Sequence, residues 1–410
     1  MKTKRILFVC YGLGIGGIEK CFVNLLNCMP EKYDIDVLLM NPQYTFKSQI
    51  KRDVNFINIF DYVMNIEDTM GEIKRRGGFA KNIEMVVAYG LFRLRIKFHR
   101  NAWMGFKKLP DTYDIAIAYS HHDFSPYYVI DKVHAKKKVL WFHNGAYEQT
   151  GVRYERDKKY YAAFDKIVAV SSDCAEMLQH KFSFKDKQLI VLRNICDSEE
   201  IMIKATAKKP CSFESEATHI VTVGRMTAEK GAILALNACR IIRDRGYNIC
   251  WHWVGDGNQC VSIKEKIKEF KLDNYFILEG NQENPYPYIK NADVYVQPSY
   301  YEAYSTTVTE AKILHKPIVA TDVGGMRDQI CDGRNGLIVP ISEDAIANGI
   351  VNLLNNKSLC NSFSFKLEEE DFSFKSILYE YEKSVFFEED EYGPISKHNC
   401  TDIQCGKNFR

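Results

Sequence analysis

Short, strongly apolar runs alternate with amphipathic stretches along most of the 410 residues, and this alternation constrains the fold more than any other feature. Runs that are apolar on both faces predict parallel strands covered by helices on either side. The first series of predicted strands covers 5–10, 34–40, 113–120, 137–142, 166–171 and 188–192. The second series covers 219–225, 247–255, 275–280, 292–299, 316–321 and 336–340. We therefore expect an α/β fold with two parallel sheets.

A mixed, charged and weakly periodic segment at 194–217 separates the two series. Two alternations with a break between them predict two doubly wound, Rossmann-like domains that face a cleft. We place the first domain at 1–195 and the second at 196–371. The remainder, 372–410, is typical of a C-terminal helix followed by a loose acidic tail.

Composition excludes several classes of protein. Hydrophobic residues make up 46% and charged residues 26%, which is the balance of a globular chain rather than a disordered or fibrous one. The net charge of +2 argues against general binding to nucleic acid. Because no run of about 18 apolar residues occurs and the N-terminus is unlike a signal peptide, we expect neither a membrane-spanning helix nor secretion. Thirteen cysteines without a CxxC pair predict reduced thiols in a cytoplasmic protein rather than a disulfide framework or a zinc site.

A glycine-rich turn follows the first predicted strand. Gly12, Gly14 and Gly17 fit the pattern G-x-G-x-x-G, in which glycines let backbone amides approach an anion at a helix N-terminus. A nicotinamide or flavin site also needs an acid at the end of the second strand, and that strand ends VLLMNPQ without one. A dinucleotide site is therefore disfavoured. A turn that presents amides to another phosphate or sugar, and a purely structural turn, both stay open.

Two cations follow the first strand of the predicted second domain. Arg225 and Lys230 lie five residues apart across a strand–turn–helix junction, in the sequence VGRMTAEKGA. An Arg can bind a diphosphate through two hydrogen bonds and a Lys adds a point charge, so this pair suits a diphosphate. A solvated pair of surface side chains is the alternative.

Two glutamates flank the start of a later helix in the same domain. Glu302 lies in the loop before that helix, and Glu310 lies in its first turns. Between them, Ser305, Thr306 and Thr307 offer hydroxyls and N-terminal amides. Such groups can hold sugar hydroxyls at one end and a ribose at the other. The alternative is a Ser-capped helix with an ordinary solvent-facing glutamate.

In this order along the chain, the motifs resemble those of the retaining glycosyltransferases of family 4, which have the GT-B architecture. The resemblance covers roughly 1–385. It is carried by the GGxE turn at Gly16, Gly17 and Glu19, the HN pair His143–Asn144, Gly224 with Arg225 and Lys230, VGDG at 254–257, ADVYVQPS at 292–299, Glu302 with Glu310, TDVGG at 321–325 and NGLIVP at 335–340.

The resemblance implies three groups of site residues. The catalytic group is Arg225, Lys230, Glu302 and His143. The donor-binding group is Gly16, Gly17, Gly224, Ser305, Thr306, Thr307 and Glu310. The acceptor-side group is Glu19 and Asn144. Neither a metal nor another cofactor is implied, because the two cations would neutralise the departing diphosphate.

The implied roles define a reaction. Glu302 would hold hydroxyls of the transferred sugar, Glu310 the ribose hydroxyls, and His143 would contact the donor sugar near the reacting carbon. The reaction would be retaining transfer from a nucleotide-sugar, expected to be UDP-linked, to a glycan or lipid-linked acceptor in bacterial polysaccharide or lipopolysaccharide synthesis. A nucleotide-sugar epimerase on the same fold and a nicotinamide-dependent oxidoreductase are the alternatives. The run 303–305, Ala-Tyr-Ser where many members have G-F-G, leaves the sugar open.

Two short motifs resemble metal sites without meeting their requirements. Asp34 and Asp36 form a D-x-D, but they lie at the start of a predicted strand, and we interpret them as a turn. His121, His122 and Asp123 lack a further ligand at strand or helix spacing. A loop after a strand is the simpler interpretation of that run.

The segment 71–109 is unusually basic, with ten cations, two acids and a net charge of +8. One helical stripe of this segment consists of Ile83, Val86, Val87, Leu91, Leu94 and Phe98. Another face carries Arg93, Lys97 and Arg100, and Trp103, Met104 and Phe106 follow. This pattern predicts an interfacial helix that binds the anionic, cytoplasmic surface of a membrane. The alternative is a stripe packed in the core with solvated cations.

Overall fold

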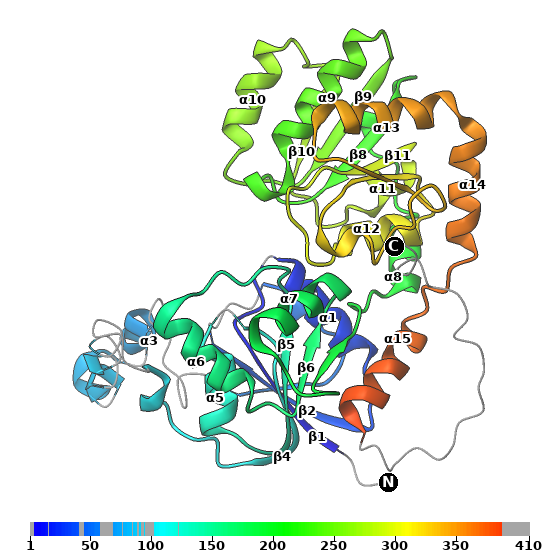
Figure 1. Ribbon diagram of the computed structural model, residues 1–410. Coiled ribbons are helices and arrows are strands. Elements are labelled where there is room, and N and C mark those ends of the chain that lie inside the picture. The colour runs from blue at the N-terminus through cyan, green and yellow to red at the C-terminus, as the bar shows by residue number, and fades with distance from the viewer. Residues whose placement is uncertain are drawn as a thin grey trace, which may run out of the picture. The chain divides into compact units, whose positions relative to one another are not determined.

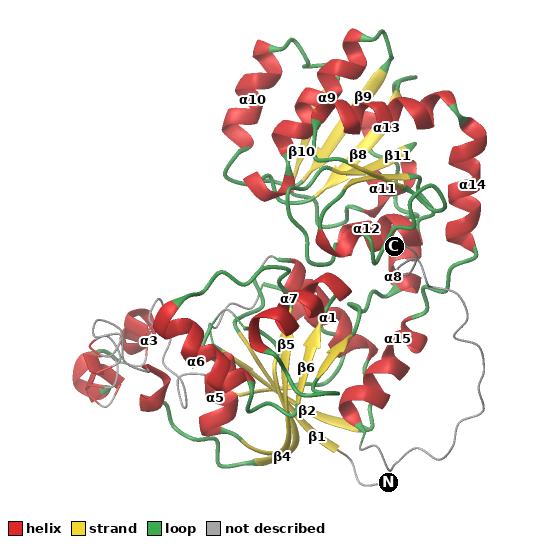
Figure 2. Ribbon diagram, viewed as in Figure 1, coloured by secondary structure: helices red, strands yellow, loops and turns green. Residues whose placement is uncertain are grey.

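The computed structural model describes residues 4–387 except 15, 41–44, 58–68, 76, 84, 88–89, 92–93, 95–101 and 122 (Figure 1). The chain forms two compact units. The first consists mainly of Met1–Val170 and Cys174–Ile195 together with Lys375–Ile395, and the second mainly of Cys196–Phe374. Each unit is a parallel sheet between helices, which confirms the predicted α/β class with two Rossmann-like domains (Figure 2).

The first unit contains a seven-stranded sheet in the order β3-β2-β1-β4-β5-β6-β7. Its strands are β1 Lys4–Cys10, β2 Tyr33–Leu39, β3 Asn55–Ile57, β4 Thr112–Ala118, β5 His134–Phe142, β6 Lys166–Ala169 and β7 Leu189–Val191. Its helices are α1 Gly17–Cys28, α3 Thr69–Arg75, α5 Ser125–Lys132, α6 Gly151–Tyr161, α7 Ser172–Phe182 and α15 Phe374–Tyr381. All six strands predicted for this unit are present.

The second unit contains a six-stranded sheet in the order β10-β9-β8-β11-β12-β13. Its strands are β8 Thr218–Val223, β9 Ile249–Val254, β10 Phe276–Gly280, β11 Val294–Gln297, β12 Ile318–Thr321 and β13 Leu337–Val339. Its helices are α8 Ser198–Lys204, α9 Ala232–Asp244, α10 Cys260–Glu269, α11 Tyr286–Asn291, α12 Thr306–Ile313, α13 Glu343–Asn355 and α14 Lys357–Glu368. All six predicted strands are again present.

Side chains alternate between the two faces of these buried strands, as the pleat requires. Along β9, Trp251 and Trp253 pack in the core formed with α9, α10 and α13. Cys250 and His252, at the intervening positions, therefore point to the opposite face, beneath α8 and α11. Both faces are buried, which explains why the strand is a continuous apolar run rather than an alternating one.

The end of the described chain returns to the first unit. Helix α15 continues into a π-helical turn, Glu382–Phe386, and Tyr381, Val385 and Phe386 are buried. The Tyr381 hydroxyl donates to the Arg193 carbonyl at 2.7 Å, and its ring lies 5.0 Å from that of Trp141. The predicted helix after 372 is thus part of the first unit rather than a separate segment, because its apolar face covers β5. The predicted acidic tail after 388 lies outside the described residues.

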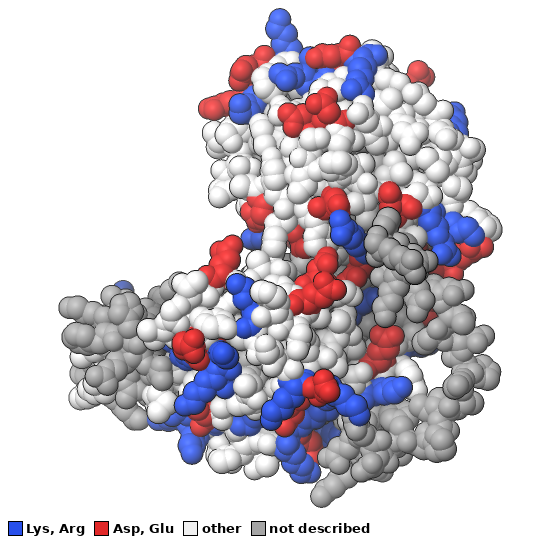
Figure 3. Space-filling view, viewed as in Figure 1, with Lys and Arg blue, Asp and Glu red and all other residues white. Residues whose placement is uncertain are grey.

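The cysteine prediction holds only in part. Cys239, Cys250 and Cys360 are reduced thiols, whereas Cys331 is disulfide-bonded. Within the described part of the chain, no helix is long and apolar enough to cross a membrane. On the face shown in Figure 3, basic and acidic side chains are interspersed, in keeping with the small net charge.

The basic segment 71–109 departs from its prediction at its C-terminal end, and its exposed apolar residues exclude the alternative of a core-packed stripe. Ile83, Val87, Leu91 and Leu94 are between 50% and 65% exposed, so these residues do not pack in a core. Trp103 and Phe106 were expected on the membrane-binding surface and are instead buried. The Trp103 indole donates to Asp131 at 2.7 Å and stacks on Tyr127, which removes it from any surface. Phe98, Arg93, Lys97 and Arg100 lie outside the described residues.

Candidate functional site

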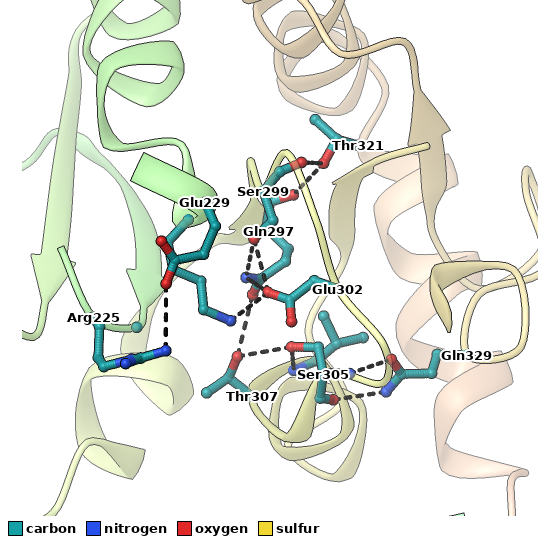
Figure 4. Close-up of polar contacts among 12 residues, drawn as sticks. Arg225, Glu229, Gln297, Ser299, Glu302, Ser305, Thr307, Thr321 and Gln329 are labelled. Atoms are coloured by element: carbon teal, nitrogen blue, oxygen red, sulfur yellow. Dashed lines mark hydrogen bonds and ion pairs between the residues drawn. The ribbon is translucent and has the colours of Figure 1, made fainter. Parts of the chain in front are cut away.

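The second sheet places a polar cluster at the carboxyl ends of β8, β11 and β12 (Figure 4). Strand order reverses between β8 and β11, and ligands bind parallel α/β sheets at such a switch point, beyond the carboxyl ends of the strands. Arg225 follows β8, and Glu302 follows β11. The fold therefore brings together two motifs that lie about 75 residues apart in the sequence.

Glu302 is the most constrained member of this cluster. The residue is 7% exposed, and its Oε1 pairs with Lys230 Nζ at 2.6 Å. The same oxygen accepts hydrogen bonds from Gln297 Nε2 at 3.0 Å and from Ser299 Oγ at 2.8 Å. Three donors on one oxygen fix the orientation of the carboxylate and compensate its burial.

The two predicted cations differ in their surroundings. The Lys230 side chain is 21% exposed and reaches Glu302 from the short turn Ala228–Lys230, just before α9. The Arg225 side chain is 62% exposed and pairs with Glu229 at 3.3 Å. An exposed ion pair of this kind contributes about 1 kcal/mol or less, so Arg225 can exchange Glu229 for an anionic ligand at little cost.

Helix α12 begins within the same cluster. Ser305 is its N-cap and accepts from the Val308 amide at 3.3 Å, so the Ser-capped helix is confirmed. The Ser305 amide is one of three amides expected to contact the donor. In the structure it donates to Gln329 Oε1 at 2.8 Å, so its hydrogen bond is made within the protein. Thr307 Oγ1 donates to Gln297 Oε1 at 3.2 Å. Thr306 is the first residue of the helix.

Glu310 lies in the second turn of α12 and is 1% exposed. The alternative that treated it as an ordinary solvent-facing glutamate is therefore wrong. Its charge adds to the burial that raises the pKa of Tyr295. A buried carboxylate next to the switch point is a candidate binding group rather than a surface residue.

Two glycines of the quoted runs VGRMTAEKGA and TDVGG hold this cluster together, although neither was assigned a role. A Cβ on Gly231 would lie 1.8 Å from the Pro298 carbonyl oxygen, and this glycine has a φ of +72°. A Cβ on Gly325 would lie 1.9 Å from the Ala303 carbonyl oxygen. Both glycines let the backbone pass close to the loop that carries Glu302. Gly224, which is predicted to bind the donor, has open space at its Cβ position, where Lys230 Cδ at 4.0 Å is the nearest atom.

The first unit contains its own pocket, of about 320 Å³, at the switch point between β1 and β4. The pocket is lined by Cys10, Tyr11, Gly12, Ile18, Glu19, Phe22, Tyr119, Ser120 and Asp123. A volume of this size is at the lower end of small-molecule sites. The glycine turn thus forms one wall of a cavity, which argues against the purely structural interpretation of that turn.

Glu19 and Asp123 supply the carboxylates of this pocket. Glu19 lies over the turn, since a Cβ on Gly16 would come within 2.2 Å of its Oε2. Gly17 is the first residue of α1 and has open space at its Cβ position. Asp123 accepts from the Ser125 amide at 2.9 Å, and burial raises its pKa from 3.8 to about 6. The sequence pattern of His121, His122 and Asp123 predicted only a loop after a strand. It gave no indication that Asp123 lines a cavity.

His143 and Asn144 follow β5 in the first unit. His143 is 9% exposed, and its ring lies 4.5 Å from that of Tyr119, which lines the pocket. The Asn144 carbonyl accepts from the Cys174 thiol at 3.1 Å. The predicted residues of the first unit therefore gather near one pocket, and those of the second unit gather near one switch point.

The D-x-D motif has a structural explanation. Asp34 and Asp36 lie within β2, not in a turn as predicted. Asp36 is 2% exposed and pairs with Arg5 at 2.9 Å. It also accepts hydrogen bonds from Asn55 at 2.7 Å and from Tyr113 at 2.8 Å. These contacts make Asp36 a core link between β1, β2, β3 and β4.

Comparison with known proteins identifies the family. Residues 15–200 match the model described as Glycosyltransferase Family 4, and residues 204–368 match the model described as Glycosyl transferases group 1. The chain belongs to the family 4 glycosyltransferases. The two matches together follow both units and include Gly16, Gly17, Glu19 and the Arg225–Glu302 cluster.

Individual relatives of this family 4 chain are distant. An uncharacterised glycosyltransferase of Methanocaldococcus jannaschii is 24% identical over 56% of this chain and 64% of its own length. The N-acetylgalactosamine-N,N'-diacetylbacillosaminyl-diphospho-undecaprenol 4-alpha-N-acetylgalactosaminyltransferase of Campylobacter jejuni is 27% identical over 50% of this chain and 55% of its own. The chain thus spans less than two thirds of the length of each of these curated relatives.

A solved structure extends the likeness over nearly the whole fold. HepE of Anabaena, solved in complex with UDP and with UDP-glucose, superposes with a TM-score of 0.69. The match covers 93% of this chain and 99% of that chain at 14% sequence identity. At this identity the likeness establishes the fold, which is the GT-B architecture.

Proposed function

We propose that the protein transfers a sugar from a UDP-linked donor, with retention of configuration, to a glycan or lipid-linked acceptor during synthesis of a bacterial surface polysaccharide. Both family models support glycosyl transfer. The name of the Campylobacter relative includes a diphospho-undecaprenol acceptor, and HepE was solved with UDP. Neither an epimerase nor a nicotinamide-dependent oxidoreductase finds support in these comparisons.

One observation carries the proposal: the contact of 2.6 Å between Lys230 and Glu302 at the switch point of the second sheet. Here a cation suited to a diphosphate touches a carboxylate suited to sugar hydroxyls. A nucleotide-sugar has these two chemical groups joined by a single bond. We assign Lys230 and Arg225 to the diphosphate, Glu302 to the sugar and Glu310 to the ribose.

The chemistry requires little more than positioning and charge. The bond between the anomeric carbon and the diphosphate oxygen breaks, and a bond from the same face forms to an acceptor hydroxyl. The proton of that hydroxyl passes to the leaving diphosphate oxygen. Arg225 and Lys230 stabilise the negative charge that develops on the diphosphate, which is the electrostatic term that dominates such reactions.

The pocket of the first unit is our candidate for the acceptor side. Glu19 lines it, and we assign Glu19 and Asn144 to acceptor contacts. His143 is assigned to the donor sugar near the reacting carbon. Gly16 and Gly17 are assigned to close backbone contacts at the α1 N-terminus, which favours anionic groups.

We further propose that the protein attaches to the cytoplasmic face of the membrane through 71–109, where a lipid-linked acceptor would be found. The support is the combination of exposed apolar side chains at Ile83, Val87, Leu91 and Leu94 with the net charge of +8 in this segment. Anionic lipid is the occupant that complements both features.

A thermal-shift panel of nucleotides and nucleotide-sugars tests the donor assignment. A ligand at 100 times its dissociation constant should stabilise the protein by about 2.7 kcal/mol. UDP and UDP-sugars should raise Tm, whereas NADH should not. A shift with NADH and none with any nucleotide-sugar would overturn the proposal. Product analysis separates the remaining alternative, because an epimerase converts the donor without an acceptor.

A further inference from the structure

A second polar cluster lies at the opposite end of the same sheet. His219 is the second residue of β8, and Cys250 and His252 lie near the start of β9. Gly224, just beyond the end of β8 at the proposed donor site, is five residues farther along the chain, roughly 16 Å away at about 3.3 Å per residue. None of the motifs discussed above includes these three side chains, and all three residues are buried.

The strand register explains how these residues meet. His219 pairs with Cys250 across β8 and β9, so both side chains lie on one face of the sheet. His252, two residues beyond Cys250, lies on that face as well. The imidazole nitrogens and the thiol sulfur that could act as ligands lie within 4.8 Å of one another.

The two imidazoles point at each other, since His219 Nδ1 lies 2.9 Å from His252 Nε2. The outer nitrogen of each ring faces an acceptor. His219 Nε2 is 3.2 Å from the Ser215 carbonyl oxygen, and His252 Nδ1 is 2.8 Å from Glu279 Oε1. When both outer nitrogens donate their protons to these acceptors, both inner nitrogens present lone pairs to the same small space.

Two ring nitrogens 2.9 Å apart are joined either by a proton, in an N–H···N hydrogen bond, or by a metal ion that both nitrogens coordinate. Metal-bound histidines in proteins almost always donate their other ring N–H to a carboxylate or a backbone carbonyl, which fixes the ring and strengthens the ligand. Glu279 and the Ser215 carbonyl supply one partner of each kind, and Phe213 stacks on both rings with centroids 4.5 and 4.0 Å away.

We propose that His219, Cys250 and His252 bind a zinc ion. Two imidazoles and a thiolate are ligands that zinc prefers. Around a tetrahedral zinc with bonds of about 2.05 Å, two nitrogens lie about 3.3 Å apart. The rings therefore need to separate by only about 0.4 Å, and a water takes the fourth position. The ion would cross-link β8 and β9, far from the proposed donor site.

Untagged full-length protein tests the site. After removal of metal with a chelator, one equivalent of zinc should bind and raise Tm. One equivalent of cobalt should give the visible absorption of a tetrahedral site together with a thiolate-to-cobalt charge-transfer band. Glu279→Gln should weaken zinc binding about tenfold to a hundredfold, the usual effect of changing a residue that orients a ligand histidine.

Substitution of the ligands makes the test specific. Cys250→Ser should abolish the charge-transfer band, and His252→Gln should abolish stoichiometric binding. Cys360→Ser, which removes another reduced thiol of the second unit, should change neither. Absence of the cobalt spectrum in the unsubstituted protein would overturn the proposal, whether or not the variants fold. A band that persists in Cys250→Ser would also overturn it, and would locate the metal on other cysteines.

Discussion

At the scale of single residues, the proposed donor site depends on one shared oxygen. Glu302 Oε1 accepts from Gln297 and Ser299 while it pairs with Lys230. The two glutamates and the two cations could be predicted from motifs, because their residue types and order are typical of the family. Gln297 lies in the quoted run ADVYVQPS, but its role could not be predicted, since a glutamine near the end of an apolar strand gives no signal of that role until the fold brings Glu302 beside it.

The first prediction concerns the proposed diphosphate contacts. Arg225→Ala and Lys230→Ala should each lower turnover by about 10²–10³, the usual cost of removing one group that stabilises developing charge. Steady-state kinetics with the donor identified by thermal shift would measure this. Arg245→Ala, an exposed arginine that bonds Asn348 in the same unit, is the matched control and should retain activity. Full activity in Arg225→Ala would contradict its assignment.

The second prediction uses the raised pKa of Asp123, which burial shifts from 3.8 to about 6. Between these values the folded protein binds more protons at this carboxyl than the unfolded chain does. Its contribution to stability is therefore present at low pH and is lost as pH rises through about 6. The asparagine of Asp123→Asn does not titrate. The unfolding free energy of this variant minus that of the wild type should therefore increase by roughly 1–3 kcal/mol from pH 4.5 to pH 7.

Urea unfolding at the two pH values measures that difference. Asp186→Asn, which changes an exposed carboxylate of the same unit, is the matched control. An equal effect of Asp123→Asn at pH 4.5 and pH 7 would mean that this carboxyl is not protonated in the folded protein near pH 5.

At the scale of secondary-structure elements, the strands were predictable and the contacts between loops were not. Twelve strands could be predicted from their apolar runs, whereas β3 is the tripeptide Asn55–Ile57, too short to form such a run. The close approach of Gly231 to Pro298 joins the turn before α9 to the end of β11. No local pattern encodes this contact, because the two segments lie 67 positions apart.

The third prediction tests that contact. Gly231 and Gly246 both have positive φ, +72° and +87°, but only Gly231 has backbone at its Cβ position. Gly246→Ala should therefore cost about 1–2 kcal/mol, the strain of a left-handed residue alone. Gly231→Ala should cost about 3 kcal/mol or more and weaken UDP binding, because the turn that carries Lys230 must move. Denaturant unfolding and the UDP-induced thermal shift measure the two effects, and equal losses in both variants would contradict this account.

At the scale of the whole molecule, the chain alternates between its units. It leaves the first unit after Ile195 and returns to it with Lys375. The return is secured by Lys137, which donates to the Val385 carbonyl at 2.7 Å, and by Tyr33, which donates to Glu382 at 2.7 Å. A helix could be predicted at this position from its period. Its destination could not, because an apolar face does not specify which core it covers.

The basic segment 71–109 poses the remaining question at this scale. Leu91 and Leu94 are 54% and 50% exposed, which costs free energy in water unless a partner covers them. Each cation near an anionic lipid surface contributes about 1 kcal/mol, and this attraction weakens as salt is added. A bilayer can bind both the apolar side chains and the charges, whereas binding of a soluble glycan acceptor would not require exposed leucines.

The fourth prediction is therefore that the protein floats with liposomes containing anionic lipid, and not with neutral ones, at low ionic strength. Replacing Leu91 and Leu94 with Ser should reduce this binding by removing the apolar contact while leaving every charge in place. The matched control replaces Ile203 and Val261, which are 70% and 72% exposed in the second unit, and should float like wild type. Negligible binding of the wild type to both kinds of liposome would remove the membrane proposal and favour a soluble acceptor, since no other feature of the described chain calls for a bilayer.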